Sequence, residues 1–274
     1  MAIAINYYFC ELIMQISFVK YSGTGNDFIL IDDRDRHSQL NDIRVIQAMC
    51  DRHFGIGSDG LMLLRDHDTS DFEMIFFNPD GSKSLCGNGS RCSVHFARQL
   101  GLAFLEGVFS TTDGEHHYRF VDDHMIEISM ADVSIADQVG EMDFINTGSP
   151  HLIVPVEDIT ELDLPNQGKK WRYDERFEEN GGTNVNFIKR VDSDSLRIRT
   201  YERGVEAETL SCGTGVTAAA LSYKKNEIGR HRVEVHTEGG ILTVRFEKTE
   251  RGFSDIKLQG PVLRIFEGIY DVRE

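Results

Sequence analysis

The chain has 274 residues, of which 40% are hydrophobic and 27% charged, and its formal net charge is −16. This composition is typical of a folded globular protein with one large domain or two of ordinary size. The acidic balance argues against binding to nucleic acid or to an anionic membrane surface, because both require clustered Lys and Arg. The five cysteines are scattered, with no CxxC or HxxxH spacing, which indicates a reducing compartment and no structural zinc. No apolar run approaches the ~18 residues that a membrane-spanning helix needs.

The predicted elements begin after a short leading segment. Residues 1–13 are interpreted as an N-terminal extension, because "MQISFVKYSGTGNDF" from Met14 onward has the pattern of a first strand. Further along, "GIGSDG" at residues 55–60 satisfies the letters of a dinucleotide-binding loop. That loop requires a strand before it and a helix after it, whereas here a helix-like segment precedes it and a strand-like one follows. The sequence therefore argues against a nucleotide site.

The middle of the chain begins to repeat the first part. Residues 22–33 and 146–158 share a Thr-Gly turn followed by an apolar run, and Cys-Gly-x-Gly occurs at Cys86 and again at Cys212. Each cysteine is followed by a helix-like segment that is expected to end at a glycine, over 90–101 and 216–229, and then by an alternating hairpin. The landmarks recur at nearly equal intervals, since 61 residues separate Gly25 from Cys86 and 64 separate Gly148 from Cys212.

The repeat predicts an α+β fold of two pseudo-symmetric domains. Each is expected to be a strongly curved antiparallel sheet or barrel wrapped around one apolar central helix. The predicted N-terminal domain covers residues 14–132 and the C-terminal domain residues 133–261. The last strand, 262–274, is expected to cross back to the first domain.

The repeated cysteine lies at the predicted start of each central helix. Backbone N–H groups and the helix dipole stabilise an anion there, so the pKa of each thiol is expected to fall from ~8.5 to between ~3.5 and ~7.5. Pseudo-symmetry would bring Cys86 and Cys212 to opposite sides of one bound molecule. One thiolate could then remove a proton from a carbon while the other thiol returns one, a racemisation or epimerisation without a cofactor. A single Cys–His nucleophile, buried packing cysteines and a disulfide between the two remain alternatives.

Polar residues in the loops leading to the cysteines suit a zwitterionic substrate. Arg203 can bind a carboxylate by its fork, Glu202 can bind an ammonium, and His151 could orient or deprotonate a thiol. Asparagines recur in the same turns: Asn26, Asn78 and Asn184.

At these residues the sequence resembles a known family. "NPDGSKSLCGNGSRC" and "YERGVEAETLSCGTG", together with "GTGND", "FGIGSDG", "NTGSPH" and "TNVNF", resemble the motifs of diaminopimelate epimerases, from about Met14 to near the C-terminus. The resemblance implies pyridoxal-independent, metal-free conversion of LL-2,6-diaminopimelate to the meso form, with no cofactor. It also implies a cytoplasmic enzyme of lysine and peptidoglycan synthesis, an active site between two similar domains, and a homodimer.

The resemblance also implies a role for each matched residue. Cys86 and Cys212 would be the acid and base thiols, flanked by His151 and Glu202. Asn26 would contact the reacting end of the substrate. The reacting carboxylate would be held by Gly87, Asn88, Gly213 and Thr214. The distal amino-acid end would be bound by Asn78, Asn184, Glu202 and Arg203.

Two other functions remain open. A proline or hydroxyproline racemase of the same architecture would need to bind only one charged amino-acid end, whereas Glu202, Arg203, Asn78 and Asn184 suit a second one. A non-catalytic amino-acid-binding protein would have no need of paired thiols.

Overall fold

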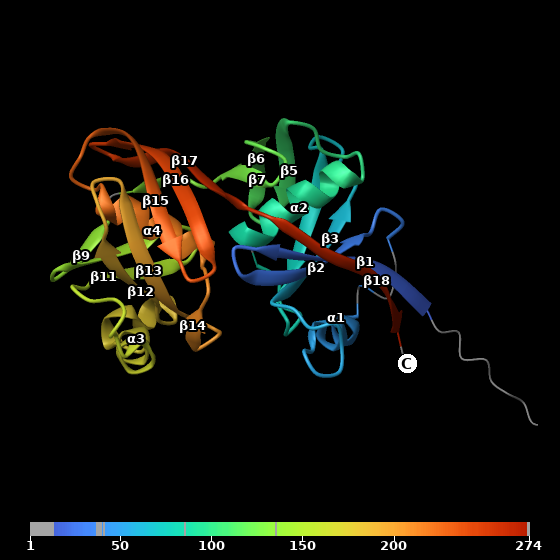
Figure 1. The fold of residues 1–274 in the computed structure, drawn as a ribbon, viewed down its shortest axis with the longest axis horizontal. Helices are drawn as coiled ribbons and strands as arrows, with labels where there is room; N and C mark the ends of the chain where they lie inside the picture. The colour runs from blue at the N-terminus through green and yellow to red at the C-terminus, as the bar shows by residue number, and fades with distance from the viewer. Residues whose placement is uncertain (1–13, 37–39, 41, 85, 135, 273–274) are drawn as a thin grey trace, which may run out of the picture.

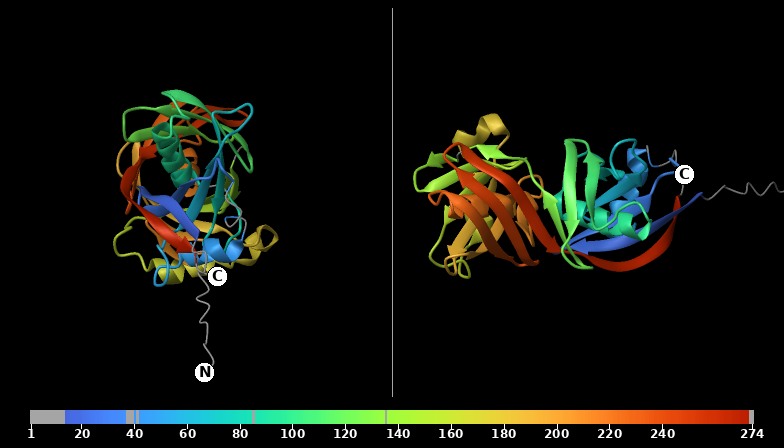
Figure 2. Two further views of the ribbon diagram at one scale, coloured as in Figure 1. Left: turned by 90° about the vertical axis from the view of Figure 1, so that its right-hand side faces the viewer. Right: turned by 90° about the horizontal axis from the view of Figure 1, so that it is seen from above.

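The protein consists of two lobes side by side, each a sheet curved around a central helix (Figures 1 and 2). The computed structural model describes residues 14–36, 40, 42–84, 86–134 and 136–272. The predicted extension at 1–13 lies outside this range. Among the described helices, none is long and apolar enough to cross a membrane.

The N-terminal lobe contains the first eight strands, the last strand and two helices. In chain order these elements are β1 (Met14–Gly23), β2 (Asn26–Asp32), α1 (Ile43–Cys50), β3 (Gly60–Arg65), β4 (Phe72–Phe77), α2 (Gly87–Gln99), β5 (Glu106–Thr111), β6 (Gly114–Phe120), β7 (Met125–Ser129), β8 (Val133–Ser134) and, from the C-terminus, β18 (Leu263–Val272).

The C-terminal lobe repeats this pattern. Its elements are β9 (Asp137–Val139), β10 (Met142–Asn146), β11 (Pro150–Pro155), α3 (Leu164–Arg172), the 3₁₀ helix η2 (Glu175–Asn180), β12 (Asn184–Arg190), β13 (Ser195–Glu202), β14 (Ala207–Thr209), α4 (Gly213–Tyr223), β15 (Gly229–Thr237), β16 (Gly240–Thr249) and β17 (Gly252–Pro261).

The two central helices, α2 and α4, lie inside the curved sheets. Most of α2 is buried, and α4 is buried on nearly all sides from Gly213 to Ser222. One apolar cluster joins their side chains to the inner faces of both sheets. Outside the sheets, α1 and α3 cover separate, smaller apolar clusters. The prediction of an α+β fold with two similar units around central helices is confirmed.

The strand pairing differs in one respect from the predicted antiparallel sheet. Four pairs are parallel: β2 with β3, β4 with β5, β11 with β12, and β13 with β15. A helix lies between the two strands of each pair in the chain, and parallel neighbours need a crossover of this kind. The helices therefore act as crossovers at corresponding places in both lobes, and the sheet is mixed.

The ends of the central helices agree only in part with the predicted ones. Helix α2 ends before Gly101, which has φ +77° and lets Leu102 donate its N–H to the carbonyl of Ala97 at 2.8 Å. Helix α4 ends at Tyr223 rather than near Gly229. The Lys-Lys-Asn-Glu run forms a turn, in which Lys224 pairs with Glu227, and Gly229 starts β15.

Strands β17 and β18 connect the lobes. β17 pairs with β16 of the C-terminal lobe and also with β7 and β8 of the N-terminal lobe. β18 then runs across the N-terminal lobe and pairs antiparallel with β1 (Figure 1). Because the sheet continues from one lobe into the other, a domain limit between residues 132 and 133 stays a prediction.

Candidate active site

The first turns of the two central helices meet where the lobes adjoin. A Cβ placed on Gly213 would lie 3.7 Å from the Cα of Gly87 and 3.6 Å from Oδ1 of Asn88. Cβ atoms on Gly87 and Gly213 would both contact the same methyl group of Leu258, at 3.3 and 3.1 Å. The two helix N-termini therefore point toward one another over a shared apolar floor. A side chain at either glycine would crowd Leu258.

Each helix is N-capped by a candidate cysteine. Cys86 (φ −132°, ψ 109°) and Cys212 (φ −128°, ψ 111°) have nearly the same extended backbone conformation, and neither side chain makes a capping hydrogen bond. Both residues are half-buried and unpaired as thiols. This arrangement presents two free thiols at two anion-stabilising helix starts.

The pKa values of both thiols lie above the ordinary value for cysteine, whereas the sequence analysis expected them to lie below it. Burial raises the pKa of Cys86 to about 11 and that of Cys212 to about 12, and the nearby carboxyl of Glu202 adds to both shifts. Backbone N–H groups at each helix start, from Gly89 and Gly215 among others, lower the pKa but do not outweigh burial. Both groups that were expected to be thiolates are therefore thiols in this structure.

A hydrogen-bonded chain of neutral groups reaches Cys212 from the core of the C-terminal lobe. The amide of Asn186 donates to the carbonyl of Leu152 (3.3 Å) and to Nδ1 of His151 (3.1 Å), so the ring proton lies on Nε2. Nε2 bonds Oγ1 of Thr214 at 2.9 Å, and that hydroxyl lies 3.4 Å from Sγ of Cys212. His151 is fully buried, and burial together with Arg203 lowers its pKa to about 3. It is a neutral partner of the thiol rather than a cation.

A second chain joins the other candidates in the N-terminal lobe. Nδ2 of Asn88 donates to Oδ1 of Asn26 at 2.7 Å and lies 3.5 Å from Oγ of Ser211, next to Cys212. Asn26 in turn donates to Asp59 at 2.9 Å. Glu202 accepts a hydrogen bond from Thr209 at 2.8 Å, and its pKa is raised chiefly by burial and also by Asp59.

Comparison with known proteins identifies this arrangement. The sequence model for the family described as diaminopimelate epimerase matches residues 18–135 and 144–261, one Cys-Gly-x-Gly motif in each interval. The chain belongs to the diaminopimelate epimerase family. The resemblance stated from the sequence is thereby confirmed, and the chain is an epimerase, an enzyme of the isomerase class.

Individual relatives agree with this family. The chain is 40% identical over 250 residues to the diaminopimelate epimerase of Flavobacterium psychrophilum, a match that covers 90% of this chain and 97% of that protein. It is 39% identical over 276 residues to the diaminopimelate epimerase of Aquifex aeolicus, covering 92% and 97%.

Solved structures of more distant proteins share the fold. A phenazine biosynthesis protein of the PhzF family from Bacillus anthracis superposes with a TM-score of 0.74 at 15% identity, covering 96% of this chain and all of that one. A hydroxyproline epimerase from Agrobacterium vitis gives 0.70 at 14% identity, covering 95% and 93%. At such low identity these likenesses show the two-domain architecture alone.

Two candidate residues of this epimerase, Asn184 and Arg203, are hydrogen-bonded to one another. Asn184 is buried, and its amide donates to Ser149 and to the carbonyl of Pro150, each at 2.9 Å, and accepts from the backbone N–H of Arg203 at 2.9 Å. The guanidinium of Arg203 donates to the carbonyl of Asn180 at 2.7 Å. Asn184 thus fixes the loop that carries Arg203.

Asn78 is the candidate whose described hydrogen bonds do not reach the rest of the site. Its amide donates to Ser82 and Ser84, all within the loop between β4 and α2. In this structure it shapes the loop before Cys86, and its hydrogen-bond partners among the described residues include no other candidate residue.

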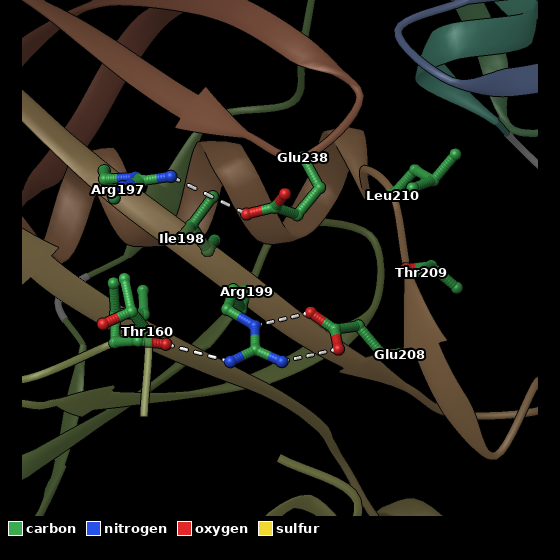
Figure 3. A pocket seen from close by; sticks show the side chains of 9 residues that line it. Thr160, Arg197, Ile198, Arg199, Glu208, Thr209, Leu210 and Glu238 are labelled. Carbon is green, nitrogen blue, oxygen red and sulfur yellow. Dashed lines mark hydrogen bonds and ion pairs between the residues drawn. The ribbon is translucent and has the colours of Figure 1, made fainter. Parts of the chain in front are cut away.

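A surface cavity of the C-terminal lobe lies beside the site, not in it. It measures about 520 Å³ and contains neither cysteine. Figure 3 shows the fork of Arg199 on Glu208 that closes one side, with bonds of 2.6 and 2.7 Å, and Thr209 at its edge. The fork of Arg199 is taken up by Glu208 and by the backbone carbonyls of Ile159 and Leu162, and the second arginine of the lining, Arg197, lies 3.8 Å from Glu238.

The residues that sequence reasoning missed include Asp59 and Asn186 of these chains and Arg91, which donates to Oδ1 of Asn88 at 2.7 Å. Two of them carried a signal. Arg91 lies in a helix predicted to be enclosed by a sheet, and Asn186 lies one alternation after Asn184 in an otherwise apolar strand. A polar residue at a position expected to be buried requires a partner, and that requirement indicates a network. In the part of the chain that the structure describes, no group of three His, Cys, Asp or Glu side chains could hold a metal ion.

Proposed function

We propose that this protein converts LL-2,6-diaminopimelate to meso-diaminopimelate by a two-thiol mechanism, in the lysine and peptidoglycan pathways. The observation that supports the proposal most is the pair of N-capping cysteines on facing helix starts. A single nucleophile would need one such thiol, and packing cysteines would need neither a helix start nor the surrounding glycines.

In the proposed reaction the substrate carboxylate lies between the two helix N-termini. Backbone N–H groups of Gly87, Asn88, Gly213 and Thr214 would receive it, because both helix dipoles favour negative charge there. The negative charge that develops as the α-proton leaves spreads into this carboxylate, so the same groups would stabilise the transition state.

The proton balance requires one thiolate and one thiol. The thiolate removes the α-proton, so the C–H bond breaks and an S–H bond forms. The opposite thiol then gives its proton to the other face of the carbon and becomes the thiolate. No net charge is created and no cofactor is consumed.

Substrate binding itself would favour the reactive thiolate. In this structure, burial and Glu202 hold both cysteines in the thiol form. A bound α-ammonium would bring a positive charge next to the sulfur atoms, and an opposite charge at close range lowers a thiol pKa. The distal amino-acid end of the substrate would then be bound by Glu202, Arg203, Asn78 and Asn184, and Asn26 would contact the reacting end.

Exchange of solvent deuterium tests the proposal. The parent enzyme is expected to incorporate deuterium at the α-carbon of diaminopimelate and to epimerise it, whereas Cys86→Ala and Cys212→Ala should each abolish epimerisation. Cys92→Ala, in the same helix as Cys86 but buried, serves as the matched control and should retain activity. Full epimerisation by either catalytic variant, or turnover of proline alone, would contradict the proposal.

We also propose a cytoplasmic homodimer. A reducing compartment would keep the two thiols from being linked as a disulfide. Support for a dimer comes from β18, which pairs only with β1 among the described strands and exposes Leu263, Ile265 and Ile269. Such an unpaired apolar edge favours association with a second copy. Sedimentation should show a dimer that Ile269→Asp dissociates, and a monomeric parent would refute it.

A further inference from the structure

A fully buried arginine lies behind the first turn of α2. Arg91 has 0% of its surface exposed, and no described carboxylate lies within ion-pair distance of its guanidinium. Its Nε has no hydrogen-bond partner among the described residues. An enclosed, unpaired cation is costly, so a purely structural role would be served better by an apolar side chain.

Arg91 contacts three segments of the active site. Its Nη2 donates to Oγ1 of Thr24 at 2.8 Å and to Oδ1 of Asn88 at 2.7 Å, and Nη1 donates to the carbonyl of Gly87 at 3.4 Å. Gly260 of β17 leaves the necessary room, since a Cβ there would lie 2.9 Å from Cζ of Arg91. The site for the guanidinium is therefore built by the β1–β2 turn, the start of α2 and the strand that joins the lobes.

Its contact with Asn88 fixes the direction of the whole N-terminal chain. Arginine only donates hydrogen bonds, so Oδ1 of Asn88 must face it and Nδ2 must face Asn26. At the other end, the Asp59 carboxylate, which is paired with Arg52, accepts the hydrogen bond, so Nδ2 of Asn26 must face Asp59. With a donor at one end and an acceptor at the other, neither amide can turn over without breaking a hydrogen bond.

Of the two candidate thiols, the positive charge of Arg91 acts on Cys86. It lowers the pKa of Cys86, whereas the hydrogen-bonding side chain at Cys212 is the neutral Thr214, backed by neutral His151. The two helix starts are alike in backbone but differ in the charge behind them.

We propose that Arg91 is a positioning residue of the epimerase, which orients the amide of Asn88 and provides a buried positive charge behind the start of α2 that makes Cys86, rather than Cys212, the first of the two thiols to lose its proton. This inference rests on the two-thiol function proposed above. It adds which thiol loses its proton first and which side chain decides the order.

The first test leaves Arg91 in place and needs no substrate. Alkylation by iodoacetamide is followed against pH, with peptide mass spectrometry identifying the modified cysteine, in Cys212→Ala for Cys86 and in Cys86→Ala for Cys212. We expect the midpoint for Cys86 to lie at least one pH unit below that for Cys212. Equal midpoints, or the reverse order, would overturn the proposal.

The second test changes the arginine in the Cys212→Ala background. Arg91→Gln should raise the Cys86 midpoint by about one pH unit, so that alkylation below the midpoint is about tenfold slower. Arg91→Lys retains the charge and should react within about twofold of the parent. In the otherwise unaltered enzyme, however, Arg91→Lys should lower kcat/KM about tenfold, because a lysine lacks the planar fork.

Arg65→Gln is the matched control. Arg65 is another largely buried arginine of the N-terminal lobe, paired with Asp33, and lies five residues along β3 from Gly60, about 16 Å from that end of the strand. It should leave the Cys86 midpoint unchanged, and an equal shift in this variant would refute a specific role for Arg91. If Arg91→Gln does not fold, the Arg91→Lys variant and the first test decide the question.

The outcomes separate this inference from the function itself. The expected midpoints without turnover of diaminopimelate would leave Arg91 in its role and refute the proposed substrate. Turnover of diaminopimelate with equal midpoints would support the proposed substrate and refute the role of Arg91.

Discussion

At Cys212 the start of the central helix lies against Asn186 and His151, whereas at Cys86 the corresponding positions hold Met62 and Phe28. The strand registers establish the correspondence, because Phe28 pairs with Gly60 in one lobe and His151 with Asn184 in the other. Met62 and Asn186 each lie two residues further along the second strand. Each would be the first neighbour met by a Cβ in the helix, on Gly89 or on Gly215.

This difference separates what the backbone provides from what the side chains provide. The backbone gives each lobe the same extended cysteine, the same glycine-rich first turn and the same inward N–H groups. The side chains then give Cys212 a neutral hydrogen-bonded chain and Cys86 an apolar wall with a buried cation. In the proposed reaction a symmetric scaffold would thus bind the carboxylate from two sides, and asymmetric side chains would decide which thiol holds the proton.

The largest expected effect comes from the same substitution made in both helices. Gly215→Ala would place a Cβ 2.4 Å from Oδ1 of Asn186, a short side chain held by three residues. Gly89→Ala would instead meet the terminal methyl of Met62 at 2.3 Å, which can swing aside. We expect kcat/KM to fall about a hundredfold in Gly215→Ala and by no more than about threefold in Gly89→Ala.

Neither glycine has a positive φ, so alanine brings no backbone strain at either position and the two variants form a matched pair. Steady-state kinetics with LL-diaminopimelate, together with thermal unfolding, would measure the contrast. Equal losses in the two variants would show that the neighbours of the helix starts do not matter.

The sequence contained most of the symmetric part of this comparison. Equal spacing between Thr-Gly turns, cysteines and hairpins sufficed to predict two units around central helices. The parallel pairs were missed because alternation within a strand does not reveal its partner, although a helix between two strands is itself a signal of a crossover.

The asymmetric part could be predicted less well. The direction of the pKa shifts was wrong, because a helix start is visible in a sequence but the burial that outweighs it arises only when two distant segments meet. The roles of Arg91 and Asn186 depend on contacts over 67 and 35 residues of sequence, which a local pattern does not specify.

A smaller effect, on stability, is expected from His151, the buried histidine whose corresponding position in the N-terminal lobe holds Phe28. Its folded pKa of about 3 lies below the ordinary value of 6.5, so between these pH values the unfolded chain binds a proton that the folded protein does not. The stability that His151 contributes is present above pH 6.5 and is lost as the pH falls through this window. From pH 6.5 to 5 the parent should lose about 2 kcal/mol more unfolding free energy than His151→Gln.

Urea unfolding of both proteins at several pH values would measure this difference, and all other titrating groups are common to the pair. Parallel curves would mean that His151 accepts a proton in the folded state. The neutral chain to Cys212 would then be a charged one, much like Arg91 behind Cys86.

The smallest expected effect isolates the hydroxyl that links His151 to Cys212. Thr214→Val keeps the shape of the side chain but removes the bonds to Nε2 of His151 and to Sγ of Cys212. Because the hydroxyl lowers the pKa of Cys212, its loss should move the alkaline limb of the pH–rate profile to higher pH. Only the bond to Sγ of Cys212 involves a reacting group, and its loss, at about 1.4 kcal/mol, corresponds to a tenfold fall in kcat/KM. Thr214→Ser should restore both the rate and the profile. A serine variant as slow as the valine variant would show that the methyl group, and not the hydroxyl, is what the second helix start requires.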